Sequence, residues 1–384
     1  MKIAITGTRG IPNRYGGFEQ FAEQLSVRLA KRGHDVRVYN PSFHPVKINE
    51  YKDVKIIRIC SPEKYIGPAA NYLYDYLCLR DALKKKADII LECGYATATP
   101  AFRLLNFRKT VLIVNVDGME WQRPNYNPFI QMIIRKAEKA VTRMGFKLVC
   151  DNPELVKYYK EKYNIVPVYI PYGADIFQNP DEQILKPFNI NPDEYFLVIA
   201  RLEPENNLRT IIKGFLNAQS ERKSISDKEL ASDMKLLSDI KLLIVGDPLN
   251  HFGRKLMKEF SDFSNILFIK DIFDQHILDN LRYFSKAYFH GHSAGGTNPS
   301  LLEAMAAGAF IIAHNNKFNR FILKDNALYF NNETDITIIL LSEKNWINKK
   351  ESFIRENRKV IIQNYRWDDI TNQYENLFKL IADT

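Results

Sequence analysis

The chain has 384 residues, 46% of them hydrophobic and 26% charged, which is typical of a folded protein with more than one core. Its 17 Gly, 17 Pro and 4 Cys are scattered through a mixed sequence, which excludes collagen, coiled coil, low-complexity disorder and a disulfide-stapled miniprotein. The formal net charge is +9, and residues 1–190 hold 29 Lys and Arg against 19 Asp and Glu. A basic half fits nucleic acid, an anionic membrane surface or a phosphorylated ligand.

The cysteines and the N-terminal segment indicate the cellular compartment in which the protein works. Cys60, Cys78, Cys93 and Cys150 form no CxxC pair and have no histidine at metal-ligand spacing, so we expect buried thiols in a reducing compartment and no metal site. The first run of the chain enters a strand pattern and soon meets glycines, which leaves no room for the apolar core of a signal peptide. No stretch reaches the roughly 18 to 20 uncharged apolar residues of a membrane-spanning helix. We therefore expect a cytoplasmic protein.

Short apolar runs alternate with helical patterns along the first 170 residues. Between the first two runs, apolar residues at helical spacing predict one buried helix face: Phe18, Phe21, Ala22, Leu25 and Leu29. Strand, helix and strand repeated in this way predict parallel strands joined by crossover helices. The expected strands are Lys2–Thr6, Asp35–Tyr39, Val54–Ile59, Asp88–Glu92, Thr110–Asn115 and Lys147–Cys150.

The same pattern restarts after a polar, proline-rich joint near residues 171–191. Two α/β units with open, mostly parallel sheets follow from this duplication, and a ligand shared by both would lie in a cleft between them. The segment 360–381 carries an apolar stripe that must pack on another surface: Trp367, Ile370, Tyr374, Leu377 and Leu380. The second set of expected strands is Tyr195–Ala200, Ile240–Val245, Asn265–Ile269, Ala287–His290 and Ala309–Ala313.

A first glycine-rich segment follows the first strand and ends in Gly16-Gly17. Its spacing does not fit the GxGxxG dinucleotide fingerprint. Free N–H groups and the positive end of the dipole at a helix start would make an anion site there, and Arg9 and Arg14 favour phosphate. A tight turn between strand and helix is an equally good interpretation.

Two further motifs follow strands of the second unit. Arg201 leaves the first of these strands, where it would either meet a ligand or form a surface ion pair. The segment 290–308 turns on glycines and opens a helix, so the amides of Gly296, Thr297 and Asn298 would face an anion. Glu303, one turn into that helix, would accept hydrogen bonds from sugar hydroxyls or merely complement the helix dipole.

Together these segments resemble the retaining glycosyltransferases of the GT4 type. GGTNPSLLEAMAAG at 295–308 is similar to their nucleotide-sugar signature, and IPYGAD at 170–175 to the segment that ends their first lobe. The resemblance covers nearly the whole chain, and its subgroup includes bacterial rhamnosyltransferases of capsule and exopolysaccharide assembly. The segments that resemble this subgroup are KIAITGTRGIPNRYGGFE, NVDGMEWQR and ARLEPENN.

The resemblance implies a GT-B fold with two Rossmann-like domains. Residues 1–180 would bind the acceptor, with a final helix 366–384 packing back on them, and residues 190–365 would bind the nucleotide-sugar without a metal. Carried over by position, Glu303 would bind the nucleoside sugar and Arg201 the diphosphate. The full implied donor set is Gly16, Gly17, Arg201, Asn206, His292, Gly296, Thr297, Asn298, Ser300 and Glu303.

Two positions depart from the family pattern. The first Glu of the family's E-x7-E pair is Gly295 here, and the usual Lys after Glu205 is Asn206. Because of these two departures, the resemblance defines the reaction class better than it defines the donor sugar.

The acceptor side is less specific. We expect Asp117, Arg201 and Glu303 to be the catalytic residues, and Asp117 would bind a donor hydroxyl or orient the acceptor. The acceptor candidates are Arg14, Tyr15, Glu120 and Trp121. For Asp117 and Glu120 the alternative is a carboxylate that caps a turn, and for Trp121 it is packing.

The segment 127–147 mixes apolar and cationic residues, which suits an anionic membrane carrying a lipid-linked acceptor, although solvated helix faces explain it equally well. We therefore expect a glycosyltransferase that moves a sugar, with rhamnose from dTDP-rhamnose as the first candidate, to a lipid-linked oligosaccharide. The alternatives are a nucleotide-sugar epimerase or hydrolase of the same fold, or a non-catalytic nucleic-acid-binding protein that uses the basic half.

Overall fold

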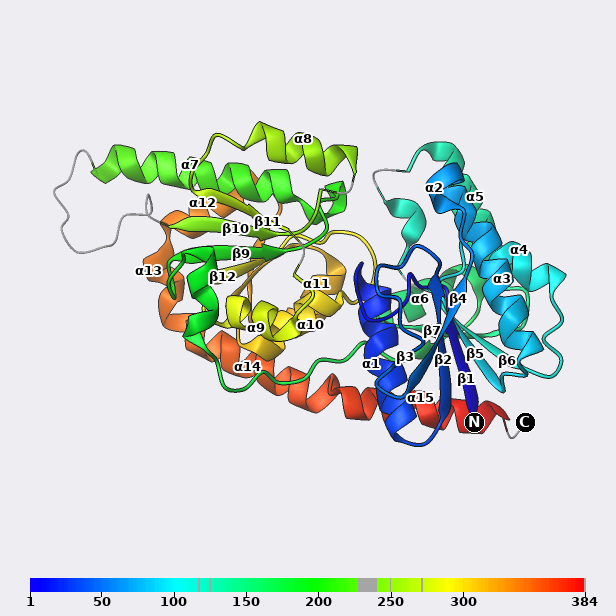
Figure 1. The fold of residues 1–384 in the computed structure, drawn as a ribbon. Coiled ribbons are helices and arrows are strands. Elements are labelled where there is room, and N and C mark those ends of the chain that lie inside the picture. Colours follow the sequence, from blue (N-terminus) through cyan, green and yellow to red (C-terminus); the bar gives the residue numbers. More distant parts are fainter. Residues whose placement is uncertain (117, 124–125, 227–239, 249, 271, 383–384) are drawn as a thin grey trace. The chain divides into compact units, whose positions relative to one another are not determined.

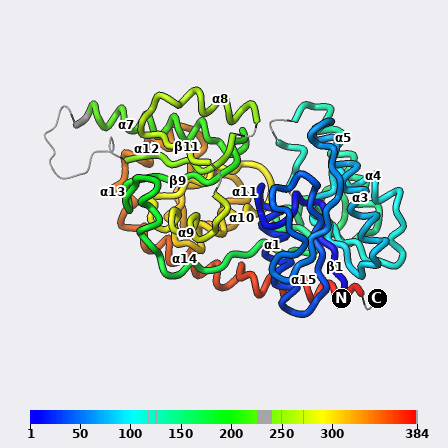
Figure 2. Tube along the Cα trace, viewed as in Figure 1, coloured from blue at the N-terminus to red at the C-terminus, as the bar shows by residue number. Residues whose placement is uncertain are grey.

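The structure is a computed structural model that describes residues 1–384 apart from 117, 124–125, 227–239, 249, 271 and 383–384. The chain divides into two compact units (Figure 1). Unit 1 comprises residues 1–173, 294–299 and 365–384, and unit 2 comprises residues 174–293 and 300–364. In Figure 2 unit 1 therefore holds both the blue start and the red end of the chain, whereas unit 2 holds the green to orange segments.

Unit 1 is built on an eight-stranded sheet in the order β3-β4-β2-β1-β5-β6-β7-β8, parallel except for the β3–β4 pair. After β1, the next strands along the chain, β2 to β4, lie on one side of β1, whereas β5 to β8 lie on its other side. This reversal makes β1 and β5 the topological switch point of a Rossmann-like sheet. The strands are β1 (Lys2–Thr6), β2 (Asp35–Pro41), β3 (Glu50–Tyr51), β4 (Val54–Ile59), β5 (Ile89–Cys93), β6 (Val111–Asn115), β7 (Lys147–Cys150) and β8 (Val168–Tyr169).

The helices of unit 1 bury apolar faces against this sheet and against one another. Phe21 of α1 lies 5.3 Å from the Tyr172 ring and 5.4 Å from the Tyr374 ring of α15, so the last helix packs on the first. Leu380 is 67% exposed, which makes our sequence prediction wrong at that position, and Phe378 takes the buried place one helical turn after Tyr374. The helices are α1 (Gly17–Lys31), α2 (Glu63–Ile66), η1 (Gly67–Ala69), α3 (Ala70–Lys84), α4 (Thr99–Leu104), η2 (Glu120–Gln122), α5 (Pro128–Val141), α6 (Pro153–Tyr163) and α15 (Trp367–Ala382).

Unit 2 has a fully parallel six-stranded sheet in the order β11-β10-β9-β12-β13-β14. This is again the Rossmann order, with the switch point between β9 and β12. Most of its strand residues are buried, as expected of a parallel sheet covered on both faces. The strands are β9 (Tyr195–Ile199), β10 (Lys241–Val245), β11 (Ile266–Ile269), β12 (Ala287–His290), β13 (Ile311–His314) and β14 (Leu328–Phe330).

One apolar core joins the helices of unit 2 to its sheet. Within it Phe310 stacks on Trp346 with ring centroids 4.8 Å apart. Several helices begin at an Asn or Asp whose side chain accepts a backbone N–H, for example Asn250, Asp274 and Asn332. The helices are η3 (Glu182–Phe188), η4 (Pro204–Asn206), α7 (Leu208–Ser226), α8 (His251–Glu259), α9 (Gln275–Tyr283), α10 (Pro299–Ala307), α11 (Lys317–Leu323), α12 (Glu333–Leu341), α13 (Glu343–Trp346), η6 (Ile347–Lys349) and α14 (Lys350–Asn364).

The fold class expected from the sequence is confirmed, since both sheets are α/β and mostly parallel. None of the helices described is long and apolar enough to cross a bilayer. Three of the four cysteines are buried, as expected, but Cys60 is exposed because it directly follows the end of β4.

Two buried carboxyl groups lie near the switch point of unit 1. Glu92 of β5 accepts a hydrogen bond from the Thr6 hydroxyl, and Asp75 of α3 accepts one from the Thr97 hydroxyl at 2.5 Å. Burial raises the pKa of Asp75 to about 7, and burial together with the nearby charge of Asp75 raises the pKa of Glu92 well above its ordinary value. Both groups therefore favour the protonated form in the folded state.

This pair predicts that the protein loses stability as the pH rises. The folded chain holds protons that the unfolded chain releases near pH 4, so the stabilisation is complete below that pH and is lost as pH rises through about 7. Asp75→Asn should reduce the loss, because the amide carries no charge at any of these pH values. We expect the melting temperature of the wild type to fall several degrees more than that of Asp75→Asn between pH 5.5 and 8.5. Parallel melting curves would contradict the assignment.

Candidate functional site

The loops that follow β9 and β12 meet at the switch point of unit 2. The Asn207 amide donates to the carbonyl of Gly291 at 2.8 Å, and Ser293 donates to the carbonyl of Glu205 from both its amide and its hydroxyl at 2.9 Å. A Cβ on Gly291 would lie 2.0 Å from the carbonyl oxygen of Asn206, so only glycine permits this approach. The two loops are therefore fixed to each other where ligands bind in such sheets.

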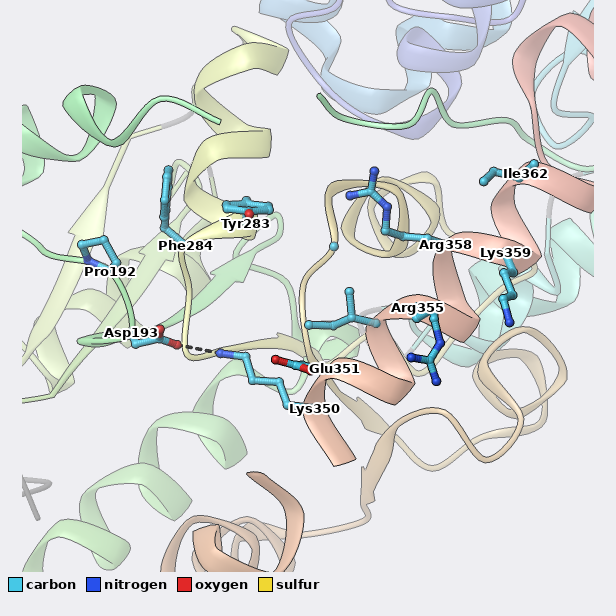
Figure 3. Close-up of a pocket in the computed structure, with 12 residues that line it drawn as sticks. Pro192, Asp193, Tyr283, Phe284, Lys350, Glu351, Arg355, Arg358, Lys359 and Ile362 are labelled. Atoms are coloured by element: carbon cyan, nitrogen blue, oxygen red, sulfur yellow. Dashed lines mark hydrogen bonds and ion pairs between the residues drawn. The ribbon is translucent and has the colours of Figure 1, made fainter. Parts of the chain in front are cut away.

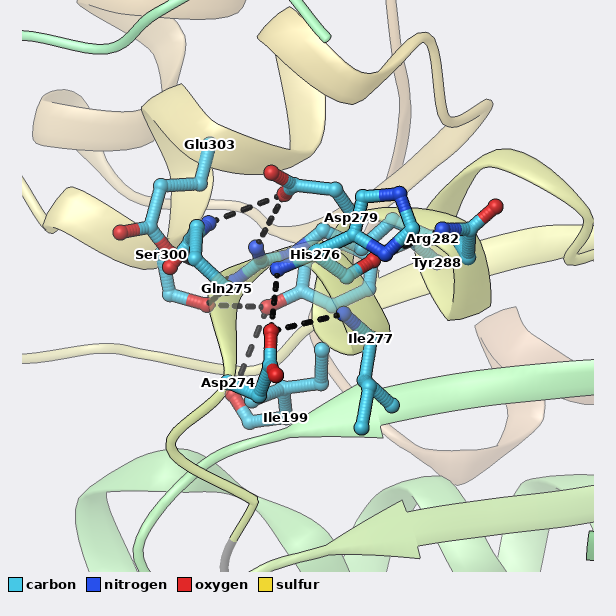
Figure 4. Close-up of polar contacts among 11 residues, drawn as sticks. Ile199, Asp274, Gln275, His276, Ile277, Asp279, Arg282, Tyr288, Ser300 and Glu303 are labelled. Carbon is cyan, nitrogen blue, oxygen red and sulfur yellow. Dashed lines mark hydrogen bonds and ion pairs between the residues drawn. The ribbon is translucent and has the colours of Figure 1, made fainter. Parts of the chain in front are cut away.

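Glu303 lies on α10 and is held by a buried arginine (Figure 4). Arg282 of α9 donates from Nη2 to the Glu303 carboxylate at 2.6 Å and to the Ser300 hydroxyl at 3.2 Å. Its Nη1 donates to the Asp279 carboxylate at 2.9 Å. The Arg282 side chain is 1% exposed, whereas that of Glu303 is 13% exposed, so the carboxylate keeps access to solvent.

The same network reaches the end of β9. The hydroxyl groups of Ser300 and Tyr288 lie 2.8 Å apart, and the Tyr288 hydroxyl donates to the carbonyl of Ile199 at 3.4 Å. Arg201 follows Ile199 by two residues, so the backbone that carries Arg201 is linked through this network to the first turn of α10.

The electrostatics of the network follow from burial and pairing. Burial opposes the charged form of Arg282, but the charges of Glu303 and Asp279 outweigh it and raise the pKa of the guanidinium. Burial raises the pKa of Asp279 to about 6, although the charge of Arg282 acts in the opposite direction. Arg282 therefore stays charged and supplies a permanent positive centre beneath Glu303.

Asn206 and His292, which the sequence placed in the donor set, contact each other. Nδ1 of His292 lies 3.0 Å from Oδ1 of Asn206, and the Asn206 amide donates to the carbonyl of Arg201 at 2.8 Å. The carbonyl of His292 accepts hydrogen bonds from the side chains of Asn316 and Asn319. Asn206 thus closes the turn after β9, at a position where the family usually has a lysine.

Residues 294–299 belong to unit 1 rather than unit 2. The Thr297 amide, which we expected to face an anion, donates to the Asp151 carboxylate at 3.1 Å, and the Thr297 hydroxyl donates to the carbonyl of Asp151 at 2.8 Å. A Cβ on Gly296 would lie 2.0 Å from an Asp151 carboxylate oxygen. In this structure the loop of Gly296, Thr297 and Asn298 is therefore packed against the end of β7.

Gly295 explains one departure from the family pattern. Its φ is +95°, a backbone conformation that side chains rarely adopt, and a Cβ on Gly118 would lie 2.1 Å from the Gly295 Cα. A glutamate at position 295 would therefore be strained.

Gly16 and Gly17 stand at the start of α1 in unit 1. Gly16 is the N-cap and has no side-chain cap bond, so the first N–H groups of the helix face the preceding loop without a capping oxygen from that residue. Glu19 accepts the Arg9 amide at 2.7 Å, and the Arg9 guanidinium pairs with Glu63 at 2.6 Å and covers the Tyr15 ring at 4.3 Å. Arg9 is thus engaged by contacts with its own loop, with α1 and with α2.

The remaining acceptor candidates are also in unit 1, apart from Asp117, which lies outside the described residues. Arg14 is exposed, and Tyr15 lies beneath the Arg9 guanidinium. The Glu120 carboxylate accepts the Tyr126 hydroxyl at 3.2 Å. The Trp121 ring is covered by Arg135 at 4.0 Å, so it has a packing role in this structure.

A separate groove of about 570 Å³ lies in unit 2 along α14 (Figure 3). It is lined by residues that precede β9 and β13, such as Asp193, which pairs with Lys350 at 2.6 Å, and Gly308. Because these residues come just before strands, the groove lies at the amino ends of the strands, whereas the loop that leads to Glu303 follows the carboxyl end of β12. None of the predicted site residues lines the groove.

Asp279, Arg282 and Tyr288 were missed by our sequence analysis. A signal existed, because Arg282 falls on the same helical face as Leu278 and Leu281, both of which are buried. A charged residue on an apolar stripe indicates a buried ion pair.

The backbone at residue 295 generates a prediction. Gly295→Glu should lower stability by about 1–2 kcal/mol, because the side chain imposes a left-handed backbone cost, and should not raise activity. Roughly 2–4 °C of melting temperature per kcal/mol is expected for domains of this size. Ala294→Glu is the matched control, since it adds the same charge one residue earlier, at a position without positive φ. Equal melting temperatures for the two variants would refute the strain argument.

Comparison with known proteins adds the family. Residues 1–175 match a domain of unknown function, DUF1972, and residues 180–360 match glycosyl transferases group 1. No curated protein sequence matches the chain.

Solved structures share the fold at low identity. Sucrose-phosphate synthase from Thermosynechococcus elongatus is 16% identical, with a TM-score of 0.77 over 100% of this chain and 99% of that one. Anabaena HepE in complex with UDP-glucose is 12% identical, with a TM-score of 0.73 over 98% of each chain. A glycosyltransferase from Rickettsia africae is 14% identical, with a TM-score of 0.64 over 99% of this chain and 98% of that one. The chain is thus a glycosyltransferase of GT-B fold, and its residues 180–360 match glycosyl transferases group 1.

Proposed function

We propose that the protein transfers a sugar, with retention of configuration, from a nucleoside diphosphate donor to a lipid-linked oligosaccharide in cell-surface polysaccharide synthesis. The first candidate donor is dTDP-rhamnose, on the sequence resemblance to rhamnosyltransferases. A nucleotide-sugar donor is supported by the HepE structures, which contain UDP and UDP-glucose.

The observation that carries the proposal is the Glu303 carboxylate at the switch point of unit 2. It lies one turn into α10, is fixed by Arg282 at 2.6 Å, and keeps partial solvent access. A fixed and accessible carboxylate is suited to accept hydrogen bonds from vicinal sugar hydroxyls. This orientation would place the nucleoside at the carboxyl end of the β9–β12 sheet.

The chemistry needs positive charge at the departing diphosphate. Arg201 leaves β9 at this edge of the sheet, and its guanidinium would stabilise the developing charge without a resident metal. The acceptor hydroxyl would attack on the face of the leaving group, and a diphosphate oxygen would take its proton. No protein nucleophile is then required, and Asp117 would orient the acceptor or bind a donor hydroxyl.

A donor-only reaction, epimerisation or hydrolysis, is the competing function. It would release nucleoside diphosphate or change the sugar without an acceptor, whereas transfer needs one. Nucleotide release measured with and without a lipid-linked acceptor separates the two.

Glu303→Ala tests the donor site. Loss of hydrogen bonds to a charged group costs about 1.5–3 kcal/mol, which corresponds to roughly a 10- to 150-fold fall in kcat/KM. The assay measures acceptor-dependent release of nucleoside diphosphate across a panel of nucleotide-sugars that includes dTDP-rhamnose and UDP-glucose.

Glu356→Ala, which removes an exposed carboxylate of α14, is the matched control and should leave kcat/KM unchanged. Unchanged turnover in Glu303→Ala would overturn the site.

We further propose that α5 places the enzyme on an anionic membrane. Its first turns expose Phe129, Ile130 and Met132 at 64%, 39% and 42%. Lys136 and Lys139 follow on the exposed part of the same helix. Exposed apolar residues followed by exposed cations are typical of a helix that lies in the headgroup region.

Vesicle sedimentation tests this surface. Lys136→Glu combined with Lys139→Glu should weaken binding to phosphatidylglycerol-containing vesicles by at least about tenfold, because each cation near such a surface contributes about 1 kcal/mol. Added salt should weaken wild-type binding. Lys359→Glu, an exposed charge reversal on α14, is the control. Equal binding to vesicles of phosphatidylcholine alone would contradict the proposal.

A further inference from the structure

The inference concerns the arginine beneath Glu303, and it rests on the proposed function of Glu303 as the group that binds the nucleoside sugar. Arg282 is buried, and a buried guanidinium is costly unless its charge is paired, as it is here by two carboxylates. Its terminal nitrogens contact three partners: Asp279 on its own helix, and Ser300 and Glu303 on α10.

The geometry of these contacts is asymmetric. Nη1 donates to Asp279, whereas Nη2 donates to both Ser300 and Oε2 of Glu303. The planar guanidinium is therefore fixed on one side by α9, and its other side fixes the first turns of α10. Since Oε2 of Glu303 already accepts a hydrogen bond from Arg282, Oε1 is the better acceptor for a ligand.

Tyr288 completes the frame. Its hydroxyl joins Ser300 to the carbonyl of Ile199, so the same hydrogen-bond chain that orients Glu303 also reaches the end of β9. Displacement of Arg282 would remove one hydrogen bond from each of Glu303 and Ser300, because one nitrogen donates to both, while Ser300 would keep its contact with Tyr288.

We propose that Arg282 is a positioning residue of the donor site, which orients the Glu303 carboxylate so that Oε1 accepts a hydroxyl of the donor nucleoside. Asp279 acts one step further out by holding the guanidinium in place. Arg282 itself does not touch the nucleotide.

The experiment measures the dissociation constants of dTDP and UDP, each paired with its 2′,3′-dideoxy analogue, by titration calorimetry. The ratio of the analogue's constant to the parent's reports only the hydroxyl contact. In the wild type this ratio should be at least tenfold for the nucleotide that binds, and Glu303→Gln should reduce it toward one. Arg282→Gln should reduce the ratio as far as Glu303→Gln does. The double variant, Arg282→Gln with Glu303→Gln, should have the same ratio as Glu303→Gln alone.

A structural role alone would weaken the parent and the analogue equally and leave the ratio intact. Arg282→Lys should restore the ratio only in part, since one ammonium cannot reproduce the planar fork. If Arg282→Gln does not fold, Asp279→Asn takes its place, with the same fall in ratio but of smaller size. Lys350→Gln, on α14, is the control that should keep the wild-type ratio.

The outcomes separate the two proposals. A wild type that binds neither nucleotide overturns the proposed function and this inference with it. If the wild type binds both members of a pair equally, the proposed contact between Glu303 and a nucleoside hydroxyl is contradicted. A wild-type ratio that persists in Arg282→Gln, or in Asp279→Asn, overturns the role of Arg282 and leaves the proposed function standing.

Discussion

Unit 2 of this enzyme depends on one buried charge, the Arg282 guanidinium. Removing an arginine from water is costly, and two carboxylates, Asp279 and Glu303, offset that cost. The arrangement joins α9 to α10 and, through Tyr288, to the end of β9. Glu303 therefore has a defined orientation because the buried charge of Arg282 requires a paired carboxylate.

The two sheets carry their candidate functional residues at equivalent points. Each has a Rossmann order, so each has one position where the chain reverses its direction of building and leaves a crevice at the strand ends. In unit 2 this position carries the loops of Arg201 and His292 and the start of α10. In unit 1 it carries the glycine-rich loop before α1 and the buried carboxyl groups of Asp75 and Glu92. The duplicated fold thus offers two candidate positions for a ligand. Residues 1–175 match a domain of unknown function, whereas residues 180–360 match a family with a named activity.

The sequence predicted the long strands well because runs such as Lys2–Thr6 and Ala287–His290 combine β-branched or aromatic residues with clear turns. It missed β3, β8 and β14, which have only two or three residues, because so short a run carries no periodicity. Motif similarity singled out Glu303 and Arg201. It did not single out Arg282 or Asp279, which belong to no motif. Only the place of Arg282 on the apolar face of α9 pointed to burial, and its partners depend on tertiary contacts.

The segment 294–299 shows why a motif predicts residue types better than contacts. The glycines of this loop suggested amides that face an anion, yet the Thr297 amide donates to Asp151, a carboxylate at the end of β7. Asp151 occupies the space that a Cβ on Gly296 would need, and the backbone at Gly118 lies against Gly295. Close packing within unit 1 therefore requires glycine at 118 and 296, and the positive φ favours glycine at 295, whatever the loop binds. The backbone conformation at Gly295 disfavours the family glutamate there, and Glu303 with its arginine is left as the fixed carboxylate of the motif.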